Sequence, residues 1–415
     1  MAKGWLFSLL SLSLVAGCGG QGAPTNPGVT RTESSGKQEA APLPVPAHLA
    51  ASTNDLGFRL LAHMSEEENV LLSPTSIASL LRMLAYGASG DTQKQMLAVL
   101  GDPKAGPTEQ QNAIKTLTSL AHRLDPEKPE PDVSIANGLF LRTQFSPKDE
   151  YVNAMRKAAE AEIVTLDFSD PNSVKTINAW VNEHTQKMIP SILGAIRDST
   201  VMIAINAVAF EGHWAAKFDP TQTVPRPFHL GDGQTVEVPM MHRTGQYAAA
   251  FLPQATIVEV PYAGGRYAMT LILPSEGTSP KKLLEAMTTE KLNQWLQQAV
   301  PKEIALALPK WTSTFERNLN NDLEALGAEL AFDPDRAEFD GIAETTERLF
   351  VQTVLHKTFV AVDEKGTKAA AVTMGEVGVT SAPERYEVVF DRPFAYLIRE
   401  TKSGVLLFAG WLNRP

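Results

Sequence analysis

Few arrangements of residues in this 415-residue chain could perform enzyme chemistry. The segment Gly87-Ala88-Ser89-Gly90 stops one residue short of the G-x-S-x-G turn that exposes a nucleophilic serine in many hydrolases. The sequence has no H-E-x-x-H pair for zinc and no G-x-x-x-x-G-K loop for a phosphate. Its one cysteine, Cys18, can form neither an intrachain disulfide nor a multi-cysteine metal site. We therefore expect no catalytic site, no metal and no cofactor.

The segment from Gly366 to Pro383 indicates a different kind of chemistry, since it has three consecutive alanines and no large aromatic residue. With the period of two that a strand imposes, one face is uncharged and small or β-branched, and the other holds both charges that follow Gly366. A flexible surface loop is the simpler interpretation, but it gives no reason for this segregation. The pattern favours a segment that can become a strand buried on one face. The uncharged face holds Thr367, Ala369, Ala371, Thr373, Gly375, Val377 and Val379, and the other holds Lys368, Ala370, Val372, Met374, Glu376 and Gly378.

The elements that must position this segment are mostly helices in the first half of the chain and strands in the second, which predicts an α+β fold with a large sheet. Ser73 before Pro74 is typical of a helix start. Apolar periodicity predicts helices near 92–100, 109–124, 148–160, 171–187, 281–298 and 316–326. Alternating or β-branched runs predict strands over Val201–Phe210, Ile257–Pro261, Tyr267–Leu273, Ile304–Leu308, Val351–Val362, Tyr386–Phe390 and Val405–Trp411.

Composition and charge exclude some classes of protein. Hydrophobic residues make up 43% and charged residues 20% of the chain, as in ordinary globular proteins. The formal net charge is -10, and no long basic run is present, so we expect no binding to nucleic acid.

The amino-terminal residues look like an export signal. Residues 1–17 combine Lys3 with an apolar run that is too short to cross a bilayer, which predicts a signal peptide. Val15-Ala16-Gly17-Cys18 resembles the bacterial lipobox, so Cys18 is the expected lipid attachment site; cleavage near Ala16 without lipidation is the alternative. Residues 18–48 begin with this cysteine and continue as a polar, Gly- and Pro-rich tether. We expect an exported protein, lipid-anchored to a bacterial membrane or cell surface, or secreted, that touches membrane only through the anchor.

Residues 50–415 contain a series of motifs in one order that resembles the serpin family. The series consists of Asn69-Val70-Leu71-Leu72-Ser73-Pro74-Thr75-Ser76-Ile77, Ala136-Asn137-Gly138-Leu139-Phe140, Ile177-Asn178-Ala179-Trp180-Val181, Ala204-Ile205-Asn206-Ala207-Val208-Ala209-Phe210 with Gly212 and Trp214, Val238-Pro239-Met240-Met241, Leu308-Pro309-Lys310, His356-Lys357, Gly366, Asp391-Arg392-Pro393-Phe394 and Phe408-Ala409-Gly410. The resemblance implies a serpin domain over 49–415, with about nine helices around three β-sheets and an exposed reactive loop.

The resemblance implies an inhibitor of serine-type endopeptidases and not an enzyme. In serpins a protease attacks the loop as a substrate, and the cut loop then inserts into the central sheet and traps the acyl-enzyme. A hinge that is small and uncharged on its inward face allows this insertion, because a buried charge without a partner is costly. The implied hinge residues are Glu364, Gly366, Thr367, Ala369, Ala370, Ala371 and Thr373. A non-inhibitory serpin that binds or assists folding of another molecule is the alternative.

The resemblance also assigns two polar sites and a reactive bond. Trp214, Lys310 and Glu364 match the breach, where the loop enters the sheet, and Lys310 and Glu364 match a salt bridge there. Ser73, Ser76, Asn206 and His356 match the polar network called the shutter; satisfied core polar groups are the other interpretation.

Counting from Gly366 places the reactive bond at Thr380–Ser381, whereas counting back from Phe394 places it at Ala382–Pro383. Since a bond before proline is a poor substrate, Thr380–Ser381 is favoured. Its small residues suit an elastase-like serine protease; chymotrypsin-like, subtilisin-like and cysteine proteases stay open as targets. We expect a monomer.

Overall fold

Two large β-sheets organise the part of the chain that the computed structural model describes, residues 42–123, 130–345, 347–367 and 385–415. These residues belong to one unit, Glu39–Pro415, and contain nine α-helices and three sheets. The α+β class and the expected set of helices and sheets are confirmed.

The helices are α1 Ala47–Ala62, α2 Pro74–Gly87, α3 Gly90–Val99, α4 Pro107–Thr118, α5 Asp149–Ala159, α6 Asn172–His184, α7 Pro280–Glu285, α8 Thr289–Leu296 and α9 Asn320–Ala325, with 3-10 turns η1 Ser119–Ala121, η2 Pro220–Gln222 and η3 Glu329–Phe332. The strands are β1 Val70–Leu72, β2 Asp132–Arg142, β3 Ser146–Pro147, β4 Glu162–Leu166, β5 Met202–His213, β6 Val224–His229, β7 Thr235–Phe251, β8 Ala255–Pro261, β9 Tyr267–Pro274, β10 Val300–Pro309, β11 Trp311–Asn318, β12 Ala343–Glu344, β13 Thr353–Asp363, β14 Gly366–Thr367, β15 Arg385–Val389, β16 Phe394–Glu400 and β17 Leu406–Leu412.

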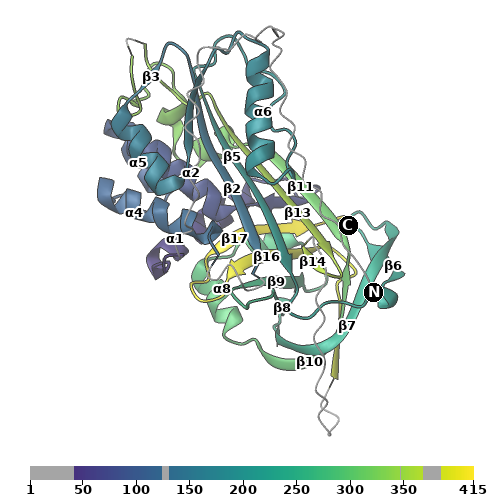
Figure 1. The fold of residues 1–415 in the computed structure, drawn as a ribbon. Helices are drawn as coiled ribbons and strands as arrows, with labels where there is room; N and C mark the ends of the chain where they lie inside the picture. The colour runs from purple at the N-terminus through teal and green to yellow at the C-terminus, as the bar shows by residue number, and fades with distance from the viewer. Residues whose placement is uncertain (1–41, 124–129, 346, 368–384) are drawn as a thin grey trace, which may run out of the picture. The chain divides into compact units, whose positions relative to one another are not determined.

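The six-stranded sheet has the order β11-β13-β14-β5-β2-β4, with β13 also paired to β5. The nine-stranded sheet runs β1-β17-β16-β9-β8-β7-β10-β15, with β6 on β7, and β12 pairs with β3 in a two-stranded sheet. Figure 1 shows α6 across one face of the six-stranded sheet, and α1, α2, α4 and α5 gathered at its side. Strand β5 is almost wholly buried, and apart from Asn206 its residues from Met202 to Phe210 are apolar, as expected for a strand covered on both faces.

Two helix predictions are wrong in part. The expected helix over 281–298 is two helices, α7 and α8, because the Thr288 side chain accepts a hydrogen bond from Lys291 N at 3.2 Å and starts a new helix. The expected helix over 316–326 begins only at Asn320, since residues up to Asn318 continue β11 with alternating buried and exposed side chains. Within the described ranges, no helix is both long enough and apolar enough to cross a membrane.

Candidate functional site

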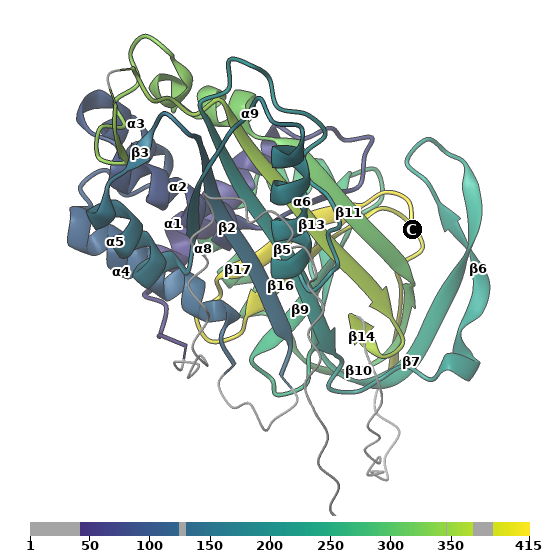
Figure 2. The same ribbon diagram turned by 45° about the horizontal axis from the view of Figure 1, so that its top comes forward.

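The contact between β5 and β13, called the seam below, is closed along most of its length and open at one end. The two strands pair in parallel from Thr353↔Ile203 to Phe359↔Ala209. Beyond this point β14 lies between them, antiparallel to both, with Thr367 opposite Val362 on one side and Gly212 on the other (Figure 2). The first two residues of the segment predicted to be able to form a buried strand, Gly366 and Thr367, therefore already form a strand inside the six-stranded sheet.

Local geometry explains how the chain turns into the seam. Asp363 Oδ1 accepts hydrogen bonds from the backbone N–H groups of Lys365 at 2.8 Å and Gly366 at 3.2 Å, which closes a tight turn after β13. Gly366 has a φ of +143°, and a Cβ there would overlap the carbonyl oxygen of Gly212 on β5. Only glycine fits this close approach of two backbones. Thr367, which follows, is 0% exposed.

The predicted salt bridge between Lys310 and Glu364 is present beside this turn. Lys310 Nζ lies 2.8 Å from Glu364 Oε2, and the hydroxyl of Thr223 donates to Oε1 at 2.8 Å. Burial opposes ionisation of Glu364, but the hydrogen bonds from Lys310 and Thr223 outweigh it, so the pKa of this carboxyl lies below its ordinary value. The carboxylate thus ties the start of the segment to the ends of two other strands.

Aromatic side chains pack beneath the open end of the seam. Trp214 Nε1 donates to the carbonyl oxygen of Asp363 at 2.9 Å, and the backbone N–H of Trp214 donates to the carbonyl oxygen of Lys365 at 3.0 Å. The Trp214 ring stacks on Tyr262, with centroids 4.6 Å apart and planes at 18°. Trp214, Lys310 and Glu364 are therefore brought together around the turn, as their resemblance to the breach implied.

A second polar cluster lies across the seam itself. Asn137 on β2, Asn206 on β5 and His356 on β13 are direct register partners, so their side chains form one row across three strands. Asn206 Nδ2 donates to Asn137 Oδ1 at 2.7 Å and to the hydroxyl of Ser76, which lies in the first turn of α2. Asn206, His356 and Ser76 are 0% exposed.

The hydrogen bonds of His356 determine its tautomer. The backbone N–H of Ser73 donates to His356 Nε2 at 3.1 Å, so this nitrogen is unprotonated. Nδ1 then carries the proton and donates to Asn206 Oδ1 at 2.7 Å. Burial lowers the pKa of His356 to about 3, because loss of hydration disfavours the charged ring by more than the hydrogen bond to Asn206 favours it. Ser73, Ser76, Asn206 and His356 thus meet as predicted, and the neutral imidazole bridges the seam to the start of α2.

Several predicted site residues lie outside the described ranges. They are the reactive-bond residues Thr380 and Ser381, the hinge residues Ala369, Ala370, Ala371 and Thr373, and the lipid attachment site Cys18. Their assignments stay predictions.

Two contacting residues were missed by the sequence assignments. Asn137 carries the same signal that singled out Asn206, a lone amide in an apolar strand, but only the matched motif around it was noted. Tyr262, which follows β8, gives no local signal, because its contact to Thr367 is made across 105 positions of the chain.

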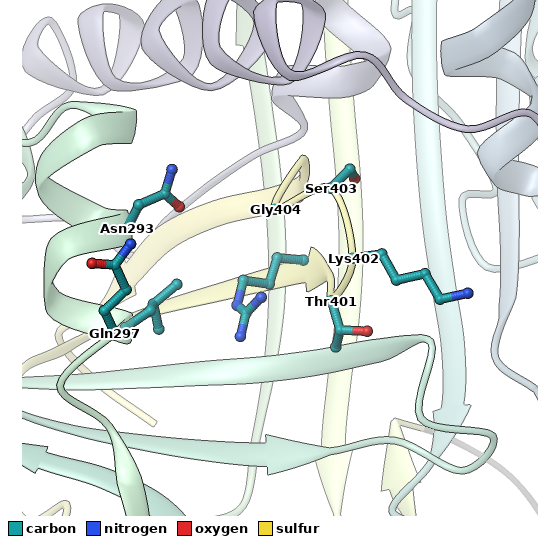
Figure 3. Close-up of a pocket in the computed structure, with 8 residues that line it drawn as sticks. Asn293, Gln297, Thr401, Lys402, Ser403 and Gly404 are labelled. Carbon is teal, nitrogen blue, oxygen red and sulfur yellow. The ribbon is translucent and has the colours of Figure 1, made fainter.

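Three features of the described residues bear on possible enzyme chemistry: Ser89 of the near-miss serine motif, a surface hollow, and the grouping of potential metal ligands. Ser89 lies between α2 and α3, not on a strand-to-helix turn, and its hydroxyl donates to Asp340 and not to a histidine. A surface hollow of about 350 Å³ lies between α8 and the turn that joins β16 to β17 (Figure 3). No histidine is among its eight lining residues, and its Ser403 hydroxyl donates to Glu400. Within the described residues, no cluster of three or more His, Cys, Asp or Glu could hold a metal ion.

Comparison with known proteins gives one consistent result. The family model described as "Serpin (serine protease inhibitor)" matches residues 51–415. Glia-derived nexin of Rattus norvegicus is 32% identical over 377 residues, covering 88% of this chain and 93% of the relative. Tengpin, a thermophilic serpin in its native state, superposes with a TM-score of 0.83 at 28% identity, over 91% of this chain and 96% of tengpin. Human thyroxine-binding globulin, complexed with thyroxine, superposes with a TM-score of 0.81 at 27% identity, over 89% of this chain and 99% of the globulin.

The neutral state of His356 predicts how stability depends on pH. The unfolded chain binds a proton at this residue near pH 6.5, whereas the folded protein does so only near pH 3. The free energy of unfolding therefore decreases as pH falls from about 6.5 to about 3, by up to about 1.4 kcal/mol per pH unit. We expect urea melts of His356→Gln to show a lower stability at pH 7 and a shallower decline between pH 6 and 4.5. The exposed His229→Gln serves as control, and equal slopes for wild type and His356→Gln would contradict the assignment.

Proposed function

The chain belongs to the serpin family, and we propose that it inhibits a serine-type endopeptidase as a suicide substrate. The serine hydroxyl of the protease attacks the carbonyl carbon of Thr380, the Thr380–Ser381 peptide bond breaks, and Ser381 leaves as the new amino terminus. The protease then stays joined to Thr380 as an ester. The segment that begins at Gly366 inserts along the seam before water can hydrolyse this ester, and the trapped protease is distorted.

One observation carries the proposal. The segment starts as β14, which already lies between β5 and β13 with the side chain of Thr367 fully buried. Further insertion therefore extends an existing strand in its existing direction. No new nucleation is needed, and the backbone groups at the insertion point already have their sheet partners.

Hydrogen bonding supplies a driving force for this extension. Closed, the seam has one parallel ladder between β5 and β13. A strand inserted in the direction of β14 would exchange it for two antiparallel ladders, and antiparallel pairing is slightly more stable per residue. Opening also has a cost, because the strand must separate His356 from Asn206, and each buried polar group left unpaired costs about 1–3 kcal/mol. The shutter residues would thus hold the seam closed until the loop is cut.

The target class follows from the bait residues. Thr380 and Ser381 are small, which suits the shallow pocket of an elastase-like protease. Chymotrypsin-like, subtilisin-like and cysteine proteases are the alternatives, and Ala382–Pro383 is the alternative bond. We propose that the protein acts as a monomer and without a cofactor.

A second candidate is a non-inhibitory binding or folding-assistant protein. This candidate is supported by the structural similarity to thyroxine-binding globulin, a protein whose solved structure is a complex with thyroxine. In that case the cut loop would stay outside the sheet.

The leader supports a separate proposal about localisation. We propose that residues 1–17 direct export and that Cys18 is lipidated, which would anchor the protein to a bacterial membrane through the 18–48 tether. The animal relatives lend this no support, so it rests on the sequence of the leader. Expression of the full chain in a bacterium should incorporate labelled palmitate, and Cys18→Ser should abolish the label. A wild-type protein that is exported without label would overturn the anchor.

Trapping predicts a covalent complex and a more stable cleaved form. Incubation of the protein with pancreatic elastase should give a band on SDS gels at the summed mass of inhibitor and protease. Cleavage of the loop should raise the melting temperature on the order of 10 °C, because each added backbone hydrogen bond contributes about 1 kcal/mol. Cleavage without a complex across serine and cysteine proteases, with an unchanged melt, would favour the non-inhibitory alternative.

A charge at the insertion point should convert the inhibitor into a substrate. Thr367 is 0% exposed between two strands, so Thr367→Arg places an unpaired cation in the sheet. We expect this variant to be cleaved at the wild-type rate but to form less than about a tenth of the complex, measured by gel densitometry. Thr312→Arg is the matched control, since Thr312 is exposed on β11 of the same sheet, opposite Ala361. Equal trapping by Thr367→Arg and wild type would show that the segment does not insert here.

A further inference from the structure

One hydrogen bond joins the inserted part of the segment to a residue outside the six-stranded sheet. The hydroxyls of Tyr262 and Thr367 are 3.1 Å apart, and either can be the donor. Tyr262 and Thr367 are both 0% exposed. Two buried hydroxyls that meet away from water satisfy each other, and loss of either would leave the other without this partner.

Tyr262 is held firmly in place for this contact. Its ring stacks on Trp214, and the two residues also form a backbone bridge. Phe210 of β5 packs edge-on against the same ring, with centroids 4.9 Å apart. The backbone N–H of Tyr262 donates to the carbonyl of Tyr267 at 2.9 Å, at the start of β9. The phenol is therefore fixed by both large sheets, and burial raises the pKa of Tyr262, so it stays a neutral partner.

The bond acts on the part of the segment that follows the glycine pivot. Glu364 and Lys365 precede the glycine and are tied by the Lys310 ion pair and the Trp214 backbone. Thr367 follows Gly366, whose lack of a Cβ lets the chain pivot. Thr367 therefore lies beyond the pivot, and among the described residues its side chain hydrogen-bonds to the hydroxyl of Tyr262.

We propose that Tyr262 is a positioning residue that holds Thr367 in the seam, so that a cut loop inserts from an anchored strand. The inference rests on the proposed function, because it concerns the competition between insertion and hydrolysis of the acyl-enzyme. Without the bond, β14 leaves the seam more often, and β5 and β13 can close over its place. Insertion then starts later and more acyl-enzymes hydrolyse, whereas attack on the distant reactive bond is unaffected.

The test compares two buried tyrosines that differ in their partner. Tyr262→Phe and Thr367→Val each remove one hydroxyl of the pair with almost no change of shape. Tyr267→Phe is the matched control, because Tyr267 is also 0% exposed and packs on Phe210, but its hydroxyl donates to the carbonyl of Leu120. Each protein is titrated against elastase, and two numbers are measured, the rate of loop cleavage and the number of inhibitor molecules consumed per protease trapped.

We expect Tyr262→Phe and Thr367→Val each to raise the number consumed about two- to tenfold, the range that one net hydrogen bond supports. The cleavage rate should stay at the wild-type value. The double variant should match the single ones, since both remove the same bond. Tyr267→Phe should lose folding stability in urea melts to a similar extent, yet consume as many molecules per protease as wild type.

Hydrogen exchange on the uncut protein gives a second readout. The amide of Thr367 should exchange faster in Tyr262→Phe than in wild type or Tyr267→Phe. Wild-type consumption and wild-type exchange in Tyr262→Phe would overturn the inference while leaving the proposed function intact. A wild-type protein that traps no protease would overturn the proposed function and the effect on trapping, and the exchange rates would then decide whether Tyr262 anchors β14.

Discussion

The structure depends on the seam between β5 and β13, where two parallel strands stop pairing before they end. Beyond Ala209, β5 no longer pairs with β13 directly, and β14 lies between the two strands and pairs with both. The two halves of the six-stranded sheet are thus joined by direct pairing along one part of the seam and through β14 at its end.

Two polar clusters act on the seam at different places. At the open end, segments far apart in sequence converge on the turn after β13, through Trp214, Lys310 and Thr223. In the closed part, the row of Asn137, Asn206 and His356 crosses three strands and reaches the start of α2. The first cluster keeps the start of the segment in place, and the second makes separation of the strands costly. Together the two clusters fit the proposed function, in which the sheet rearranges and the target protease supplies the bond-breaking chemistry.

The hinge shows how narrow the sequence requirements are at this point. Gly366 is the residue whose substitution would clash with the backbone of β5, and Thr367 is small enough to lie buried between two strands. Both were assigned from sequence by type, as a pivot and an inward-facing small residue. The phenol that meets Thr367 was not, because a tyrosine after an apolar strand looks the same whether it packs in a core or bonds to a distant segment.

The sequence alone determined the fold class, most helices and seven of the seventeen strands in the described residues, since these follow from periodicity, glycine and proline positions and the order of motifs. Residues such as Asn206 and His356 were recognisable because a polar group in an apolar strand must find a partner. Only the tertiary structure decided which residues are the hydrogen-bond partners of Asn206 and His356. The row through Asn137 exists because three strands distant in the chain align in register, and the Tyr262 contact exists because β8 ends beside β14. Contacts of this kind depend on strand order and register, which no local pattern of residues encodes.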